Sequence, residues 1–202
     1  MKNKNLTKLT GLIGLIGLIT ALVVSSMSLH AQNQKQMSLD DYTLQIEGTS
    51  NLHDWEMDVT EISGYTRTMF NSPTLAGIED AEITVNVKGI KSDKNLMDKK
   101  TYNALKADDY SEITYEVQGV DDLKTSGSQF SGTAFGDLTI AGETKHVLIP
   151  FEGKVNNGGE GLTVTGEYAL DMTEYNVEPP KAMMGSIKTG EEVKLKYEFK
   201  FR

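Results

Sequence analysis

Apolar and polar residues alternate with a period of two along most of the chain, which is the pattern of β-strands with one buried face. The clearest example is EEVKLKYEFKF, in which Val193, Leu195 and Tyr197 share one face while Lys194 and Lys196 lie on the other. Turn-forming runs such as NNGG separate these segments. The pattern predicts eight strands, near residues 42–48, 54–63, 81–90, 112–120, 130–141, 144–154, 162–171 and 191–201.

Eight antiparallel strands favour a closed barrel or a sandwich, because closure of the sheet removes exposed strand edges. One segment, KNLMDKKTYNALKADD, breaks the alternation and is rich in helix-forming residues, with Asp98 early and Lys106 late as the helix dipole prefers. We expect a short helix over 97–106, across the outside of a barrel or over one of its mouths. The pattern therefore predicts an all-β fold class, an eight-stranded antiparallel barrel or a sandwich, with one short helix inserted between strands.

The first 31 residues have the order of a secretory signal peptide. Three lysines precede an apolar stretch from about Leu9 to Val24, and the run SSMSLHA offers a cleavage point after Ala31. The alternative is a membrane anchor, but the stretch is shorter than the roughly 20 residues that a spanning helix needs. A cleaved signal predicts a periplasmic or secreted bacterial protein. The expected organisation is a signal peptide at 1–31, a flexible leader at 32–40 and one β-barrel domain at 41–202.

The chain is acidic and lacks cysteine. Lys and Arg number 20 against 29 Asp and Glu, a formal net charge of −9, and loss of the signal with its three lysines lowers this to −12. Phosphate backbones and anionic membrane surfaces repel such a chain, so we expect no nucleic acid partner. Without cysteine, disulfides and a lipid-modified N-terminal cysteine are excluded. We expect no stable membrane anchor after signal cleavage.

The stretch TSNLHDWEM places His53 and Asp54 beside the only tryptophan, which raises a hydrolase or isomerase as an alternative. A hydrolytic triad also needs a nucleophile, and no GxSxG elbow is present. A metal site needs three or four convergent ligands, and beyond Ala31 the chain has only His53 and His146, with no HExxH. Acidic doublets fall at predicted turns or helix ends. We therefore expect a protein without catalytic or metal-binding residues, in which Asp54 favours the turn before a strand.

One glycine-rich stretch, FSGTAFGDLTIAG, contains neither GxGxxG nor a Walker pattern. It falls within a predicted strand, where glycine marks a bend or a close approach of backbones. We therefore interpret Gly132 and Gly136 as packing positions and expect no phosphate site there.

Aromatic residues and methionines recur on the apolar strand faces. Core packing explains most of them, but an eight-stranded barrel is also wide enough to hold one ligand. Methionine suits an adaptable wall because its side chain is flexible and polarisable. Two interpretations stay open at this point, a filled structural or interaction barrel without a ligand and a barrel that binds an apolar molecule in its lumen.

Three stretches together resemble the YceI-like family. GDLTIAGETKHVLIPF at 136–151 resembles its signature of a glycine, a short strand and G-x-T-K-x-V. The segment at 92–120 resembles its turn, helix and strand, and the segment at 49–70 its N-terminal strand with a tryptophan. The resemblance implies an extended, lipocalin-like barrel of eight strands whose lumen binds a long isoprenoid or other amphiphilic lipid. It also implies an exported protein without catalytic activity.

We therefore expect a binding protein that holds an isoprenoid, quinone or fatty-acid-like lipid for transport, storage or a stress response. No other cofactor is expected, and a homodimer stays open as an alternative. Regular apolar strand faces provide the candidate lumen residues. The helix and the long loop before the last strand provide the candidate mouth residues. The candidate ligand-binding residues are Trp55, Met57, Val85, Tyr115, Phe130, Tyr168, Leu195 and Tyr197 in the lumen, with Met97, Tyr102 and Met183 at the mouth.

Overall fold

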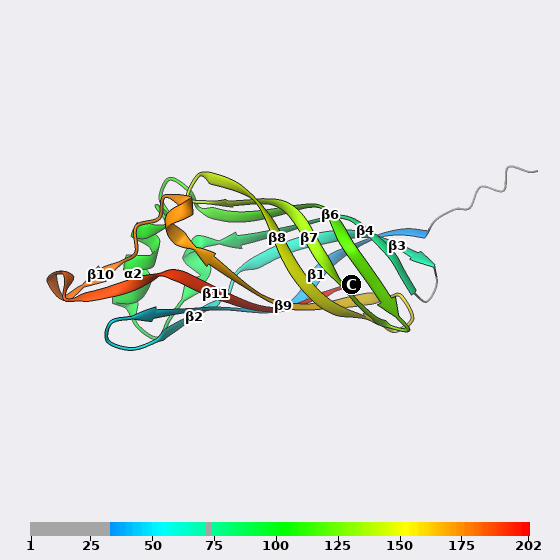
Figure 1. Cartoon of the computed structure of the whole chain (residues 1–202), viewed down its shortest axis with the longest axis horizontal. Coiled ribbons are helices and arrows are strands. Elements are labelled where there is room, and N and C mark those ends of the chain that lie inside the picture. The colour runs from blue at the N-terminus through cyan, green and yellow to red at the C-terminus, as the bar shows by residue number, and fades with distance from the viewer. Residues whose placement is uncertain (1–32, 72–73) are drawn as a thin grey trace, which may run out of the picture. The chain divides into compact units, whose positions relative to one another are not determined.

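Eight antiparallel strands, each hydrogen-bonded to the next, close into a barrel (Figure 1). The structure is a computed structural model that describes residues 33–71 and 74–202, so the expected signal peptide lies outside the described residues. The order around the barrel is β1-β3-β4-β6-β7-β8-β9-β11, and β11 pairs back with β1. This confirms the expected fold class. The strands are β1 (Asn33–Ser50), β2 (Trp55–Val59), β3 (Ile62–Asn71), β4 (Thr74–Asn86), β5 (Ile90–Lys91), β6 (Glu112–Ser126), β7 (Gln129–Ile140), β8 (Glu143–Asn156), β9 (Gly161–Asp171), β10 (Lys181–Ala182) and β11 (Ile187–Phe201).

β2 and β3 act as one interrupted strand, because both pair with β1 in the same register. Between the two paired regions, Tyr42 of β1 replaces the missing ladder bonds with its side chain. Its hydroxyl donates to the backbone oxygen of Thr60 at 2.7 Å and accepts from the backbone N–H of Ile62 at 3.3 Å. The single strand predicted at 54–63 therefore spans this interruption.

The expected flexible leader is wrong for residues 33–40, which form the first part of β1. They pair with β3 from Asn33 opposite Phe70 to Ser38 opposite Tyr65, and the side chain of Met37 is only 1% exposed. The segment looks like a linker because nearly all of its side chains are polar. A backbone ladder, however, needs no apolar side chain on its outward face, so one buried methionine is compatible with a strand.

The alternation predicted for the last strand is present in β11. Leu195 faces the lumen, while Lys194 pairs with Glu167 of β9 and Lys196 pairs with Glu47 of β1 on the outer surface. Such exposed ion pairs contribute little to stability, because water and salt screen them. Their main consequence is a polar outer wall around an apolar interior.

One end of the barrel is closed by packed side chains. Phe130 and Phe151 meet edge to face with ring centroids 6.2 Å apart, and Leu162 and Phe201 are buried beside them. This end of the barrel lies away from the helix (Figure 1). The buried members of the closing cluster are Met37, Phe70, Leu75, Val117, Phe130, Ala134, Phe151, Val155, Leu162 and Phe201.

A helix covers the other end, which we call the mouth (Figure 1). The helix α2 (Asn95–Ala104) lies two residues earlier than the expected 97–106. Its buried Asp98 accepts hydrogen bonds from the backbone N–H of Ser92 at 2.8 Å and from the Ser92 hydroxyl at 2.7 Å, which fixes the turn before the helix. Within the described ranges, no helix combines the length and apolarity needed to cross a membrane.

Two strand glycines allow close packing, as expected. A Cβ atom added at Gly136 would overlap the backbone oxygen of Glu116 and lie 2.8 Å from Cα of Val117, on the neighbouring strand. A Cβ atom at Gly132 would lie 2.8 Å from the side chain of Val120. At Gly136 the obstacle is backbone, which can move only if β6 and β7 separate.

We predict that Gly136→Ala lowers the free energy of unfolding by about 3 kcal/mol, the upper part of the range for overpacked sites. The control is Gly158→Ala in the turn between β8 and β9, where an added Cβ meets no atom within 4 Å. The control position has φ +69, so its cost is about 1 kcal/mol from backbone strain alone. Urea unfolding of both variants measures the difference, and equal losses would contradict the close approach at Gly136.

Candidate functional site

The barrel lumen contains two apolar chambers placed end to end. The mouth chamber has a volume of about 360 Å³ and lies beneath α2, and the inner chamber of about 170 Å³ lies deeper in the barrel. The two chambers share part of their walls, so only one layer of side chains separates them. We call these shared residues the waist; they are Leu44, Val85, Ile113, Leu138 and Leu195.

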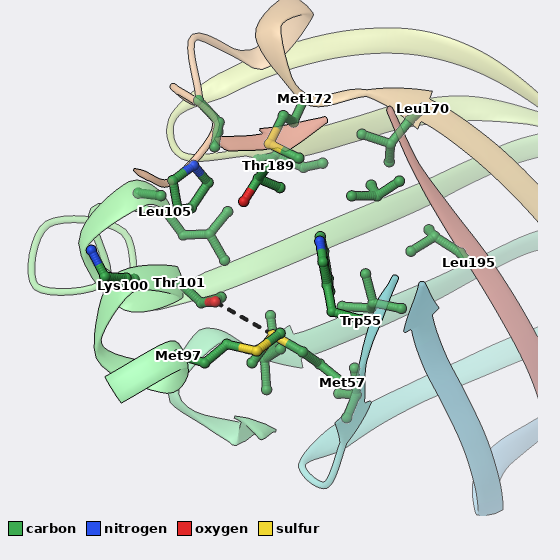
Figure 2. A pocket seen from close by; sticks show the side chains of 18 of the residues that line it. Trp55, Met57, Met97, Lys100, Thr101, Leu105, Leu170, Met172, Thr189 and Leu195 are labelled. Atoms are coloured by element: carbon green, nitrogen blue, oxygen red, sulfur yellow. Dashed lines mark hydrogen bonds between the residues drawn. The ribbon is translucent and has the colours of Figure 1, made fainter. Parts of the chain in front are cut away.

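Trp55 at the start of β2 forms one wall of the mouth chamber, and Figure 2 shows its indole pointing into the space. Its cross-strand partner is Gly48 of β1, and any side chain at Gly48 would overlap the indole ring. The indole N–H donates to the backbone oxygen of Thr49 at 2.9 Å. The glycine and this hydrogen bond together fix the ring, so the tryptophan is a rigid wall.

The helix supplies a cover for the mouth chamber. Met97 and Thr101 of α2 and Leu105 just after it line the chamber (Figure 2). The Thr101 hydroxyl donates to the sulfur of Met57 at 3.4 Å, which links the helix to β2. Toward the chamber the cover presents mainly apolar side chains, and the two methionines can change rotamer at low cost.

Polar groups of the mouth chamber lie at its open edge. Ser50, His53 and Thr189 line the chamber together with Lys94, Lys100 and Lys181, and among the described residues no carboxylate does so. The ammonium of Lys100 donates to the backbone oxygen of Lys181, whose own ammonium pairs with Glu178 at 2.7 Å. The lumen is therefore apolar in depth and cationic only at its edge.

The inner chamber is lined by three tyrosines among aliphatic side chains. The Tyr115 hydroxyl donates to the backbone oxygen of Ala134 at 3.1 Å, and that of Tyr197 donates to the backbone oxygen of Pro150 at 3.3 Å. Burial raises the pKa of Tyr115, Tyr168 and Tyr197 above the ordinary tyrosine value. Because these phenols stay neutral and two of them are bound to backbone oxygens, the inner chamber offers an uncharged, largely apolar surface.

Eight of the eleven residues predicted from the sequence line the chambers. Trp55, Met57 and Met97 line the mouth chamber. Tyr115, Tyr168 and Tyr197 line the inner chamber. Val85 and Leu195 belong to the waist. The structure thus brings together residues that are up to 142 positions apart in sequence. Strand alternation places seven of them on the inner face, and Met97 comes from α2.

Tyr102 does not line either chamber. It lies on the side of α2 that faces the barrel wall, where its hydroxyl is 3.0 Å from the backbone oxygens of both Lys88 and Ile90. It also accepts a hydrogen bond of 2.7 Å from the ammonium of Lys91. Tyr102 therefore attaches the helix to the segment between β4 and β5.

Phe130 and Met183 also lie away from the two chambers. Phe130 is 4% exposed and belongs to the cluster that closes the far end of the barrel. Met183 is 73% exposed on the loop between β10 and β11, pointing to solvent at the mouth. The apolar pattern correctly indicates an inward face for Phe130, but it carries no information about depth along the barrel.

Several lining residues were not among the candidates. Leu138 and Ile140 of β7 and Leu170 of β9 line the mouth chamber, and the alternation in FGDLTIAG is the signal that could have identified the first two. Lys100 and Thr101 face the chamber from α2 without any sequence signal, because polar residues on a short helix ordinarily face water.

The pair His53-Asp54 lies in the turn that precedes β2, as expected. The His53 ring nitrogen Nδ1 is 2.7 Å from the backbone oxygen of Asp54, not from its carboxylate. Ser50 organises the turn, since its hydroxyl donates to the backbone oxygen of His53 at 2.7 Å. Among the described residues, no group of three His, Cys, Asp or Glu is placed to hold a metal ion. The pair thus has a structural part in the turn.

Solved structures with a similar fold come from several bacteria. A polyisoprenoid-binding domain from Saccharophagus degradans superposes with a TM-score of 0.64 at 11% identity, covering 85% of this chain and 98% of its own. BcnA from Burkholderia cenocepacia gives 0.61 at 16% identity, covering 80% and 98%. A YceI protein from Campylobacter jejuni gives 0.55 at 15% identity, covering 71% and 82%. At these identities the likeness concerns the fold.

A comparison with curated protein sequences finds no match. The family model described as a YceI-like domain, by contrast, matches residues 27–201, which is nearly all of the chain. The two chambers, the closed end and the covering helix are therefore features of a protein that belongs to the YceI-like family.

Proposed function

We propose that the protein binds one long amphiphilic lipid, with its apolar chain in the two chambers and its head group at the mouth. The observation that carries this proposal is the lumen itself, which is apolar from the waist to the inner chamber and closed at the far end. Along β11, Phe199 in the inner chamber lies ten positions after Thr189 at the mouth. At the usual rise and tilt of barrel strands the lumen is about 25 Å deep.

Burial of the lipid chain would supply most of the affinity, at roughly 0.8 kcal/mol for each methylene removed from water. The polar groups at the edge, including Thr101, Thr189 and Lys100, would hold the head group. An isoprenoid chain is the favoured ligand because one protein with the same fold is described as a polyisoprenoid-binding domain. Quinones and fatty acids have the same amphiphilic design and belong to the same proposal.

A carrier without catalytic activity agrees with the site. His53 and Asp54 form a turn, and the hydroxyls of Tyr115 and Tyr197 are hydrogen-bonded to backbone oxygens in a mainly apolar chamber. Transport and storage both need a deep apolar site with one polar edge, and neither needs a nucleophile.

The protein purified from its own host should carry a lipid. Native mass spectrometry is expected to show an adduct on the folded chain, and organic extraction should release a molecule with a long apolar chain. The filled structural barrel is the competing interpretation. A single mass of the bare chain, with no lipid in the extract, would favour that interpretation over ours.

Blocking the waist should separate long ligands from short ones. Leu195→Trp fills the passage between the chambers, so the lipid-free protein should bind geranylgeraniol about a hundredfold more weakly, through loss of several buried methylenes. Geraniol, which needs only the mouth chamber, should bind with unchanged affinity. The matched control is Lys194→Trp on the outer face of the same strand. Calorimetric titration measures both ligands, and equal geranylgeraniol affinity in the two variants would argue against occupation of the inner chamber.

We also propose that the protein is exported to the periplasm or secreted. The order of charged, apolar and small residues in 1–31 supports this proposal. Mass analysis of the protein from the host should give a mature N-terminus within a few residues of Gln32. Replacing two leucines of the apolar stretch by arginine should retain the precursor in the cytoplasm, and a native protein that keeps Met1 in the cytoplasmic fraction would contradict export.

A further inference from the structure

Exposed apolar side chains gather around the mouth. Leu52 is 64% exposed, Leu96 is 67%, Met183 is 73% and Met184 is fully exposed. Isolated exposed leucines are normal on protein surfaces, but a group of them around one opening is not. We call these four residues the rim. They come from three separate segments, the β1–β2 turn, the start of α2 and the loop between β10 and β11.

Hydrogen bonds tie the three segments of the rim together. The side-chain amide nitrogen of Asn51 donates to the backbone oxygen of Ser186 at 2.8 Å. The side-chain oxygen of Asn51 accepts from the backbone N–H of Lys188 at 2.9 Å. On the other side, Lys100 of α2 bonds to the backbone of Lys181. The rim is thus built as a connected edge of the barrel.

The backbone of the last segment holds its methionines in an uncommon conformation. Met183 has φ 49 and Met184 has φ 57, in the left-handed region that side chains with a Cβ rarely adopt. Strain of this kind persists where surrounding structure enforces it and is concentrated at functional sites. Here its result is two adjacent methionines directed into solvent.

The rim continues directly into the mouth chamber. Leu96 is exposed to solvent and at the same time lines the chamber, and Pro180 and Ile187 line it from the segments that flank the exposed methionines. An apolar molecule that leaves the lumen therefore meets the rim first.

The charge around the rim differs from that of the whole chain. The three segments 51–54, 93–100 and 178–188 contain five lysines and four acidic residues, whereas the chain as a whole has a net charge of −9. One of the four acids, Asp98, is buried and hydrogen-bonded to Ser92. An anionic surface would repel the walls of the barrel but not its mouth, so the charge distribution favours approach with the mouth first.

We propose that the rim docks on the surface of a phospholipid bilayer, where the lipid passes between the membrane and the lumen. Leu52, Met183 and Met184 would enter the boundary between head groups and acyl chains, and the neighbouring lysines would reach lipid phosphates. The contact is weak and reversible, because it involves only a few side chains. The proposal rests on the proposed function, since it gives the bound lipid its route.

Vesicles of phosphatidylethanolamine and phosphatidylglycerol provide the test. The purified protein should co-sediment with them, and the double variant Leu52→Gln/Met184→Gln should bind about tenfold more weakly because two apolar side chains no longer enter the interface. Neither residue lines a chamber, so the affinity of the lipid-free variant for geranylgeraniol should equal that of the wild type. The matched control is Leu148→Gln, a leucine that is 58% exposed on β8 of the barrel wall.

The two readouts separate this proposal from the proposed function. A wild-type protein that carries lipid but does not bind vesicles would overturn docking alone. A protein that binds vesicles through the rim yet never carries lipid would overturn the proposed function while leaving the docking surface. Equal vesicle binding by the rim variant and by Leu148→Gln would also overturn docking, since general hydrophobicity would then explain the binding.

Discussion

The pairing of the last strand with the first is the constraint on which the rest of this structure depends. β11 runs along β1 from Leu39 opposite Phe201 to Ser50 opposite Thr189, and this ladder turns an open sheet into a barrel. Without it, both strands would be exposed edges and the apolar face of every strand would be open to water. With it, eight inward faces enclose a lumen whose width is set by the strand number together with the tilt and stagger of the strands. The chambers are thus a geometric result of closure.

What remains to be explained is why the lumen is not filled. At the closed end, Phe130 of β7 and Phe151 of the neighbouring β8 meet edge to face within a buried apolar cluster. Toward the mouth the inward residues are mostly aliphatic, and the largest of them, Trp55, packs closely against Gly48 and leaves the mouth chamber open beside it. An apolar void costs free energy because its walls lack contacts. The hydrogen-bonded strands cannot collapse to remove it, so a ligand that fills the void recovers those contacts.

The fold could be predicted because strand alternation is a local property that each segment shows by itself. The inward face could be predicted for the same reason, and Met57, Tyr115 and Leu195 from that face line the chambers. The depth of a residue along the barrel depends on the register between strands that are distant in sequence. The apolar pattern therefore predicts Phe130 in the lumen, whereas it belongs to the cluster that closes the far end. The prediction of a flexible leader is wrong for a related reason. Residues 33–38 pair with β3 through their backbone, and a polar sequence gives no sign of such pairing. Nothing in the sequence indicates that Lys100 and Thr101 of α2 face the chamber.

The closed far end has one further consequence for any molecule that occupies the lumen. A barrel open at both ends would be a conduit, through which a chain could pass from one side to the other. A lumen that ends at Phe130, Phe151 and Phe201 is a blind socket, so a chain must enter tail first and leave head first through the same opening. Loading and unloading are then the same movement run in opposite directions, and the direction of net traffic is decided by what lies outside the mouth.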